Sequence, residues 1–421
     1  MKLQIFGNLV LGLVLLCISS CNNDDPSPAD GPTDFFTLEA AQSFSTAEDE
    51  YWVLASSSSG EWIAWHEFKS GETIKLNGTV PDDGTFTVHF LAVPKLSTGQ
   101  KQVKVHTYES VATGSKWILK GSSSVPKTYP QLTVNVTNYT PSASRTFPNQ
   151  ALTVSSSTGT GGLSGSITGS NYTYNVDIGK SPSDILVTLY KNDGPYYVRY
   201  DNLAIPATVN IDAATQGKIA DRTFTMNLPE NVYHFIYLQA FNQNSLPFEM
   251  SGIYNDKGSS QEKLGYDNGY TSYRTQVQCS IIGKSRYFSK VGSAIIEQPS
   301  MPDFSITASL KSLSDFNAVS SLSYDYALTR FDYSTPQLAY LHLVTQPKGQ
   351  SSIDFKFQPF PQELTTKYPF LPSPTQVKAL TVTGYQREGI TYEQLLEENA
   401  SSALYGAGNL NNVYMFTQQI N

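Results

Sequence analysis

The chain has 421 residues, and because a single hydrophobic core stops growing at about 250 to 300 residues, we expect two to three domains. Only 15% of the residues are charged, whereas 26 Tyr and 21 Phe accompany many Gly, Ser and Thr, a composition that favours β-structure rich in turns. The net charge of −8 arises within residues 21–68, which hold ten acidic residues and no Lys or Arg. The nearly neutral remainder excludes nucleic acid as a partner, since nucleic acid requires a basic face.

Residues 1–20 have the features of a signal peptide. Lys2 precedes an apolar run over residues 3–16, and two serines follow before Cys21. The run is too short to cross a bilayer, which takes about 20 residues. Two interpretations are open at this point: an ordinary secretory signal, cut after its small residues, and a signal of the lipoprotein type.

Residues 18–21, Ile-Ser-Ser-Cys, resemble a bacterial lipobox, and the Asn-Asn-Asp-Asp that follows resembles the acidic export signal of Bacteroidota surface lipoproteins. The resemblance implies that Cys21 is diacylated and becomes the mature N-terminus, because attachment through more than one acyl chain is durable. It also implies that the protein is held on the outer membrane by this lipid anchor and faces the cell exterior. The resemblance covers residues 18–25 only, so it predicts location and leaves activity open.

The mature chain predicts an all-β protein of two to three immunoglobulin-like β-sandwich domains in tandem, with one short helix near the C-terminus. Its first segment is a polar, Pro-containing tether that buries too little surface to fold. The expected divisions are a tether at 21–34, a Trp-containing β-domain at 35–124, one or more β-domains with a Gly/Ser-rich loop at 130–289, and a C-terminal β-domain with the helix at 291–421.

Alternating apolar and polar residues predict the strands. The helix is placed at 391–399, where Thr391 and Gln394 can form a capping box, whereas five prolines within 359–374 predict an irregular excursion. A strand–turn–strand pattern with an aromatic second strand recurs faintly at 51–73, 185–209 and 338–360. The predicted strands cover residues 50–55, 61–68, 85–93, 102–111, 116–120, 132–137, 173–178, 184–190, 196–200, 207–211, 223–228, 232–241, 276–281, 304–310, 322–331, 337–345, 353–357, 377–385 and 413–418.

The first candidate binding surface is a hairpin that carries three of the four Trp. Pairing of its strands across the serine-rich turn puts Trp52 opposite Ala64, with Trp62 on the same face and Trp65 on the other. One sandwich core covers only one face, and exposed aromatic rings stack on sugars, so Trp52, Trp62 and Trp65 are candidate glycan-binding residues. The alternative is that the protein itself covers both faces, as is usual for large aromatic side chains.

A second hairpin, formed by residues 85–93 and 102–111, places His89 opposite His106 on its polar face. Two cross-strand histidines suit a metal ion or a pH sensor. No third ligand is visible, so His89 and His106 are only weak candidates for a metal site. The alternative is a solvated polar face.

A third candidate is the long polar segment at 254–274, where Tyr254, Tyr266, Tyr270 and Tyr273 lie among Gly, Ser, Asn and Asp. This composition resembles an antibody paratope, in which rigid amphipathic rings are surrounded by adaptable polar residues. Long loops are uncommon and often functional, so these four tyrosines are candidates for ligand binding. The alternative is a hairpin with a mobile tip.

The sequence contains no HExxH, G-x-S-x-G or Walker motif and no zinc-ligand spacing, and it predicts no cofactor. The resemblance implies that Cys17 leaves with the signal peptide and that Cys21 is lipidated, which would leave Cys279 without a disulfide partner. Cys279 is expected to be buried in a strand.

We therefore expect non-catalytic binding of an extracellular glycan or protein, or an accessory role in a nutrient-uptake assembly. Two alternatives stay open. One is a glycoside hydrolase, whose carboxylate pair meets in space and is not visible in a sequence. The other is a structural or adhesive surface subunit.

Overall fold

Strands dominate the fold, and both helices of the described residues, α3 (Gln362–Lys367) and α4 (Tyr392–Ser401), are short, which confirms the all-β prediction. No helix of the described residues is long and apolar enough to cross a membrane. The signal peptide and Cys21 lie outside the described residues. The computed structural model describes residues 33–44, 49–94, 99–121, 128–142, 151–215, 217–219, 222–227, 233–242, 246–255, 261–348, 352–401 and 411–420.

The first seven strands form two facing layers, in which β4, β1 and β7 face β3, β2, β5 and β6. Aromatic rings fill the space between the layers: Phe35 meets Phe86 edge to face at 4.8 Å, and Phe36 meets Trp117 at 5.4 Å. The strands of this first set are β1 (Thr33–Ala40), β2 (Glu50–Ser56), β3 (Trp62–Phe68), β4 (Thr73–Gly78), β5 (Thr85–Val93), β6 (Lys101–Ala112) and β7 (Ser115–Leu119).

The pairing scheme of this set recurs three more times along the chain. In each set the first strand pairs antiparallel with the fourth, the second with the fifth, and the fifth with the sixth. The first two sets also have a seventh strand, which runs parallel to their first.

The strands of the second set are β8 (Gln131–Thr137), β9 (Leu152–Ser156), β10 (Thr160–Thr168), β11 (Asn171–Ile178), β12 (Ser183–Lys191), β13 (Gly194–Leu203) and β14 (Ala207–Asp212), followed by the short β15 (Lys218–Ile219). Those of the third set are β16 (Arg222–Asn227), β17 (Tyr233–Phe241), β18 (Phe248–Asn255), β19 (Gln261–Tyr266), β20 (Ser272–Ile281) and β21 (Lys284–Gly292). In the fourth set an extra strand, β22 (Ile306–Ser312), precedes β23 (Asp315–Ser320), β24 (Tyr326–Ser334), β25 (Leu338–Pro347), β26 (Ser352–Phe355), β27 (Lys378–Arg387) and β28 (Val413–Gln419).

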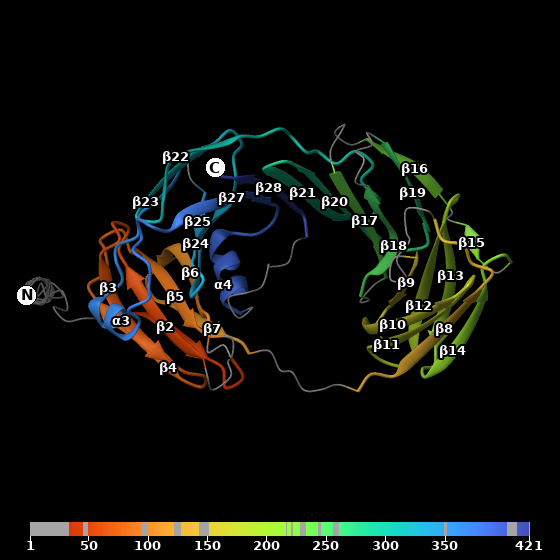
Figure 1. Cartoon of the computed structure of the whole chain (residues 1–421), viewed down its shortest axis with the longest axis horizontal. Coiled ribbons are helices and arrows are strands. Elements are labelled where there is room, and N and C mark those ends of the chain that lie inside the picture. The colour runs from red at the N-terminus through yellow and green to blue at the C-terminus, as the bar shows by residue number, and fades with distance from the viewer. Residues whose placement is uncertain are drawn as a thin grey trace, which may run out of the picture.

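The sets curve round so that the last lies beside the first (Figure 1). Three of them share one sheet, whose path runs β18-β17-β20-β21-β28-β27-β24-β25-β6-β5-β2-β3. The pairing of β21 with β28 joins the third set to the fourth, and the parallel pairing of β25 with β6 joins the fourth set to the first. A simple tandem row therefore does not describe this arrangement, because strands from opposite ends of the chain are hydrogen-bonded neighbours.

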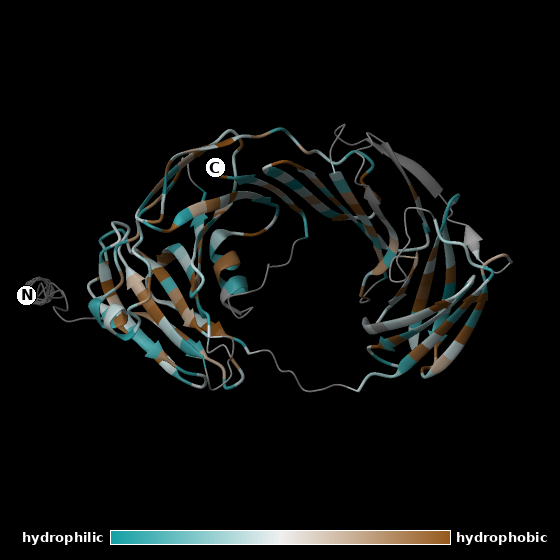
Figure 2. Ribbon diagram, viewed as in Figure 1, coloured by the Kyte–Doolittle hydropathy of each residue, from teal (hydrophilic) through white to brown (hydrophobic). Residues whose placement is uncertain are grey.

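The second set lies outside the shared sheet and packs against the third. Leu186 and Tyr197 of the second set share an apolar cluster with Phe248 and Met250 of the third. Hydrophobic and hydrophilic residues alternate along the strands, as expected where one face of a sheet is buried (Figure 2).

The predicted C-terminal helix is confirmed as α4, and its capping box is present. The Thr391 N–H donates to Gln394 Oε1 at 3.0 Å, and the Gln394 N–H donates to Thr391 Oγ1 at 3.3 Å. The expectation of an irregular segment at 359–374 is wrong in one respect, because α3 lies within it. Cys279 is buried in β20, as expected, and burial raises the pKa of its thiol to about 11.

Candidate functional site

The Trp hairpin forms, but the predicted register is wrong by three residues. Trp52 lies opposite Glu67 rather than Ala64, because the turn closes between Ser57 and Glu61 and a bulge follows at Ala55 and Ser56. The bulge also brings Trp62 and Trp65 to the face that carries Trp52.

Another part of the same chain covers this face. The indole N–H of Trp62 donates to Pro359 O at 2.8 Å, that of Trp65 to Glu363 Oε2 at 2.9 Å, and that of Trp52 to Tyr368 Oη at 3.1 Å. Trp52 is 3% exposed and Trp62 is half-buried, while Trp65 keeps 37% of its surface accessible. The three rings therefore anchor residues 359–368 and do not form one open row.

The segment at 254–274 is not one long loop, because β19 occupies part of it and pairs with β16. Tyr270 and Tyr273 are buried in the apolar cluster between the second and third sets. Tyr266 is partly buried and meets Tyr273 edge to face at 5.6 Å. Tyr254 lies in β18, and its side chain is outside the described part of the structure. At least two of the four tyrosines therefore hold the sets together.

The predicted pairing of His89 with His106 is wrong by one residue. The hairpin pairs His89 with Thr107 and Phe90 with His106, and a shift of one residue moves a side chain to the other face of the sheet. His89 is 1% exposed, so it does not lie on a solvated face, and burial lowers its pKa to about 3. His106 is half-buried, and burial and Lys104 lower its pKa to about 4.

His89 belongs to a chain of buried polar side chains that crosses the join between β6 and β25. Its Nε2 lies 2.9 Å from Ser56 Oγ and its Nδ1 lies 2.8 Å from Thr107 Oγ1. Thr107 Oγ1 is 2.7 Å from His342 Nε2, and His342 Nδ1 is 3.0 Å from Tyr340 Oη. Across the described ranges, His, Cys, Asp and Glu form no group able to hold a metal ion. This series of hydrogen-bonded polar side chains connects β6 to β25 and so fixes the join of the first and fourth sets of strands.

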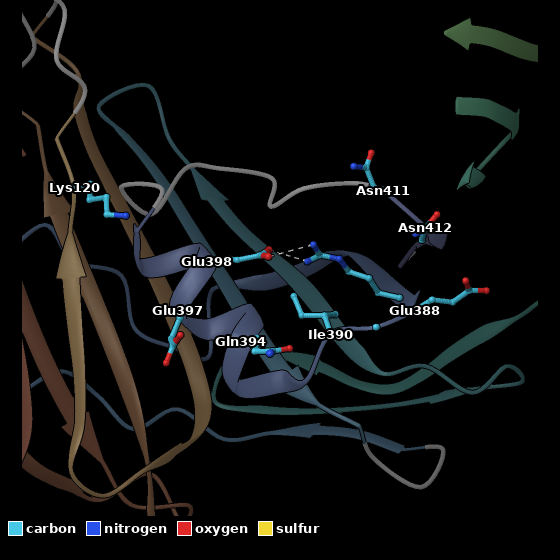
Figure 3. Close-up of a pocket in the computed structure, with 10 residues that line it drawn as sticks. Lys120, Glu388, Ile390, Gln394, Glu397, Glu398, Asn411 and Asn412 are labelled. Carbon is cyan, nitrogen blue, oxygen red and sulfur yellow. Dashed lines mark hydrogen bonds and ion pairs between the residues drawn. The ribbon is translucent and has the colours of Figure 1, made fainter. Parts of the chain in front are cut away.

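A polar groove of about 720 Å³ opens between α4 and the adjoining ends of β27 and β28. Figure 3 shows Gln394, Glu397 and Glu398 projecting from α4, with Ile390 and Asn412 beyond them. Gly389, at φ +76°, makes the turn that leads from β27 towards α4. The lining residues are Lys120, Arg387, Glu388, Gly389, Ile390, Gln394, Glu397, Glu398, Asn411 and Asn412.

Ion pairs and hydrogen bonds fix the walls of the groove. Arg387 Nη1 donates to Glu398 Oε2 at 3.0 Å, and the side chain of Arg387 is only 7% exposed (dashed lines in Figure 3). Glu388 pairs with Lys290 of β21 at 3.1 Å, and Asn412 Oδ1 accepts the N–H of Val291 at 3.0 Å. Because Lys290 and Val291 belong to the third set, the groove lies where the third and fourth sets join.

This arrangement offers many hydrogen-bond donors and acceptors and charges of both signs, and its surface is more polar than apolar. The carboxylate, guanidinium, ammonium and amide groups of this lining suit the binding of a polar ligand. The sequence offered no signal for this site, because its residues come from β7's end, β27, α4 and the approach to β28.

No family model matches the chain, and no curated protein matches it.

Proposed function

We propose that the chain is a cell-surface lipoprotein that binds an extracellular glycan or protein without catalysing a reaction. Residues 18–25 support the location, since they resemble the lipobox and export signal of surface lipoproteins. In this proposal Cys21 carries the acyl chains, and the acidic tether holds the folded part away from the outer membrane.

Each set of strands is proposed to be an immunoglobulin-like sandwich. The repeated pairing of first with fourth, second with fifth and fifth with sixth strands supports this proposal, as do the separate cores of the first two sets. The chain would then contain four such units rather than the two to three expected from its length.

The ligand site is proposed to be the groove beside α4. The observation that carries this proposal is a groove lined by acidic, basic and amide side chains whose positions are fixed from two sets of strands. In concave ligand sites, polar groups at fixed positions orient the ligand and provide specificity.

A glycoside hydrolase is less well supported. Such enzymes need one carboxyl that stays protonated and a second carboxylate opposite it. In the groove, Glu398 is paired with Arg387, Glu388 is paired with Lys290 and Glu397 is exposed on α4, so none is a carboxyl in apolar surroundings.

Two experiments test the proposed function. Metabolic labelling with a fatty acid should mark the wild-type protein and not Cys21→Ala, and protease added to intact cells should digest the anchored chain.

For the ligand, immobilised glycans and extracellular proteins are screened with the mature chain, and the affinity of each hit is measured for the wild type and for Glu397→Ala. Glu393→Ala is the matched control, since both residues are exposed on α4 but only Glu397 lines the groove. Equal binding by both variants would contradict the groove as the ligand site.

A further inference from the structure

A row of side chains crosses the sheet beside the groove. The cross-strand register places one residue of each of six neighbouring strands directly in line, from β17 through β20, β21, β28 and β27 to β24. Neighbouring strands lie about 4.8 Å apart, so the row is roughly 24 Å long. In strand order it consists of Phe235, Gln278, Tyr287, Met415, Tyr385 and Tyr326.

The row lies on the α4 side of the sheet. Tyr385 and Arg387 are two residues apart on β27 and so point to the same face, and Arg387 pairs with Glu398 of α4. The opposite face is the core side, where Val277, Cys279 and Phe416 are buried. Of the six residues in the row, Gln278 is exposed, Tyr326 is buried and the other four are partly exposed.

Four of the six residues in the row are aromatic and none is charged. Tyr385 stacks on Tyr326 with ring centroids 4.3 Å apart, and the amide of Gln276 donates to Tyr287 Oη at 2.7 Å. Tyr rings present an apolar face and a polar edge, and the neighbouring amide groups both donate and accept hydrogen bonds. Saccharides match this combination, because their ring faces carry C–H groups and their edges carry hydroxyls.

We infer that an extended, neutral oligosaccharide lies along the accessible part of this row, from Phe235 to Tyr385, with one end directed to the groove beside α4. This inference rests on the proposed function, since it takes the groove as part of the ligand site. The row runs through the join of β21 and β28, so the site exists only when the third and fourth sets are joined. An extended peptide fits less well, because peptides that extend a sheet bind at its edges, and this row lies on a face between the edge strands β18 and β3.

The test is titration calorimetry of the full mature chain with neutral tetra- to hexasaccharides of glucose, xylose and mannose, beside acidic oligosaccharides and peptides. At least one neutral oligosaccharide should bind, and Tyr287→Ala should weaken it about tenfold or more. Gln278→Ala, at an exposed position where folding is not at risk, should weaken it severalfold. Tyr129→Ala is the control, because Tyr129 is 40% exposed and lies outside the row.

The outcomes separate this inference from the proposed function. Neutral oligosaccharide binding that is lost in Glu397→Ala but unchanged in Tyr287→Ala and Gln278→Ala would overturn the row and keep the groove. Binding of acidic saccharides or peptides alone would overturn the neutral-saccharide inference and keep a binding function. Saccharide binding that neither the groove nor the row variants weaken would overturn both.

Discussion

Trp65 of β3 donates its indole N–H to Glu363 of α3 at 2.9 Å, although 298 positions separate the two residues. The bond is one of three by which residues 359–368 of the fourth set cover the Trp hairpin of the first. Lys367 adds an ion pair to Glu67 at 2.7 Å. Side chains that look like a ligand platform in the sequence are thus a docking surface between distant parts of one chain.

The cost of removing each indole N–H should follow its burial. Trp52→Phe leaves a gap beside the buried Tyr368 hydroxyl and should lower the free energy of unfolding by about 1 to 3 kcal/mol. Trp65→Phe, at a position 37% exposed, should cost no more than about 0.5 kcal/mol. Urea denaturation of both variants measures the difference. Equal losses would argue against the packing described for this face.

The polar chain at the join of β6 and β25 should depend on Thr107. Thr107→Val removes the hydroxyl that contacts both His89 and His342, leaves two buried imidazoles without this partner, and should cost about 2 to 4 kcal/mol. Thr329→Val is the matched control, because Thr329 is equally buried and its hydroxyl has no hydrogen-bond partner. This second variant should be neutral or slightly stabilising by thermal denaturation. The prediction fails if the two valine variants unfold alike.

Glu109 should make the stability of the same join depend on pH. Burial raises the pKa of Glu109 from 4.5 to about 7. The hydrogen bond from Gln346 lowers this pKa, and the charge of Asp354 raises it. Between these values the folded chain holds a proton that the unfolded chain has released, so this residue lowers the free energy of unfolding as pH rises through that range. At pH 5 and below, most of this loss in the free energy of unfolding is absent.

Glu109→Gln mimics the protonated side chain and keeps an oxygen for the Gln346 amide. Compared with the wild type, the variant should gain about 1 to 3 kcal/mol of stability between pH 5 and pH 8. Other titrating groups, such as the buried histidines, affect both proteins and cancel in the comparison. A stability difference that does not change with pH would show that Glu109 is not desolvated at this join.

The sequence supports the all-β class and the cap of α4, because alternation and capping are local patterns. Register is not local: the position of the turn and a bulge beside it move Trp52 three residues from its predicted partner, and His89 pairs one residue away from His106. The faint sequence repeat is also misleading, since its segments correspond to β2–β3, β12–β13 and β25–β26, which occupy different places in the pairing scheme. The true repeat lies in strand pairing, which sequence similarity does not reveal.

The candidate site could be predicted from the sequence even less well than the strand register. Arg387 ends a strand, Glu397 lies on a helix and Asn412 precedes another strand, and only the joining of β27, β28 and β21 brings them to one groove. The His342 contact with Thr107 likewise depends on parallel pairing of strands 235 positions apart. Such long-range joins are set by edge-to-edge packing of whole sets of strands.

The most direct test of the binding account is hydrogen–deuterium exchange of the full mature chain, with and without the oligosaccharide that binds best in the titrations. Binding at the groove and along the row should slow exchange at residues 388–394, at the start of β28 and in β21, and should leave the Trp hairpin turn at 57–61 unchanged. Protection confined to the hairpin turn and α3, with none beside α4, would contradict it.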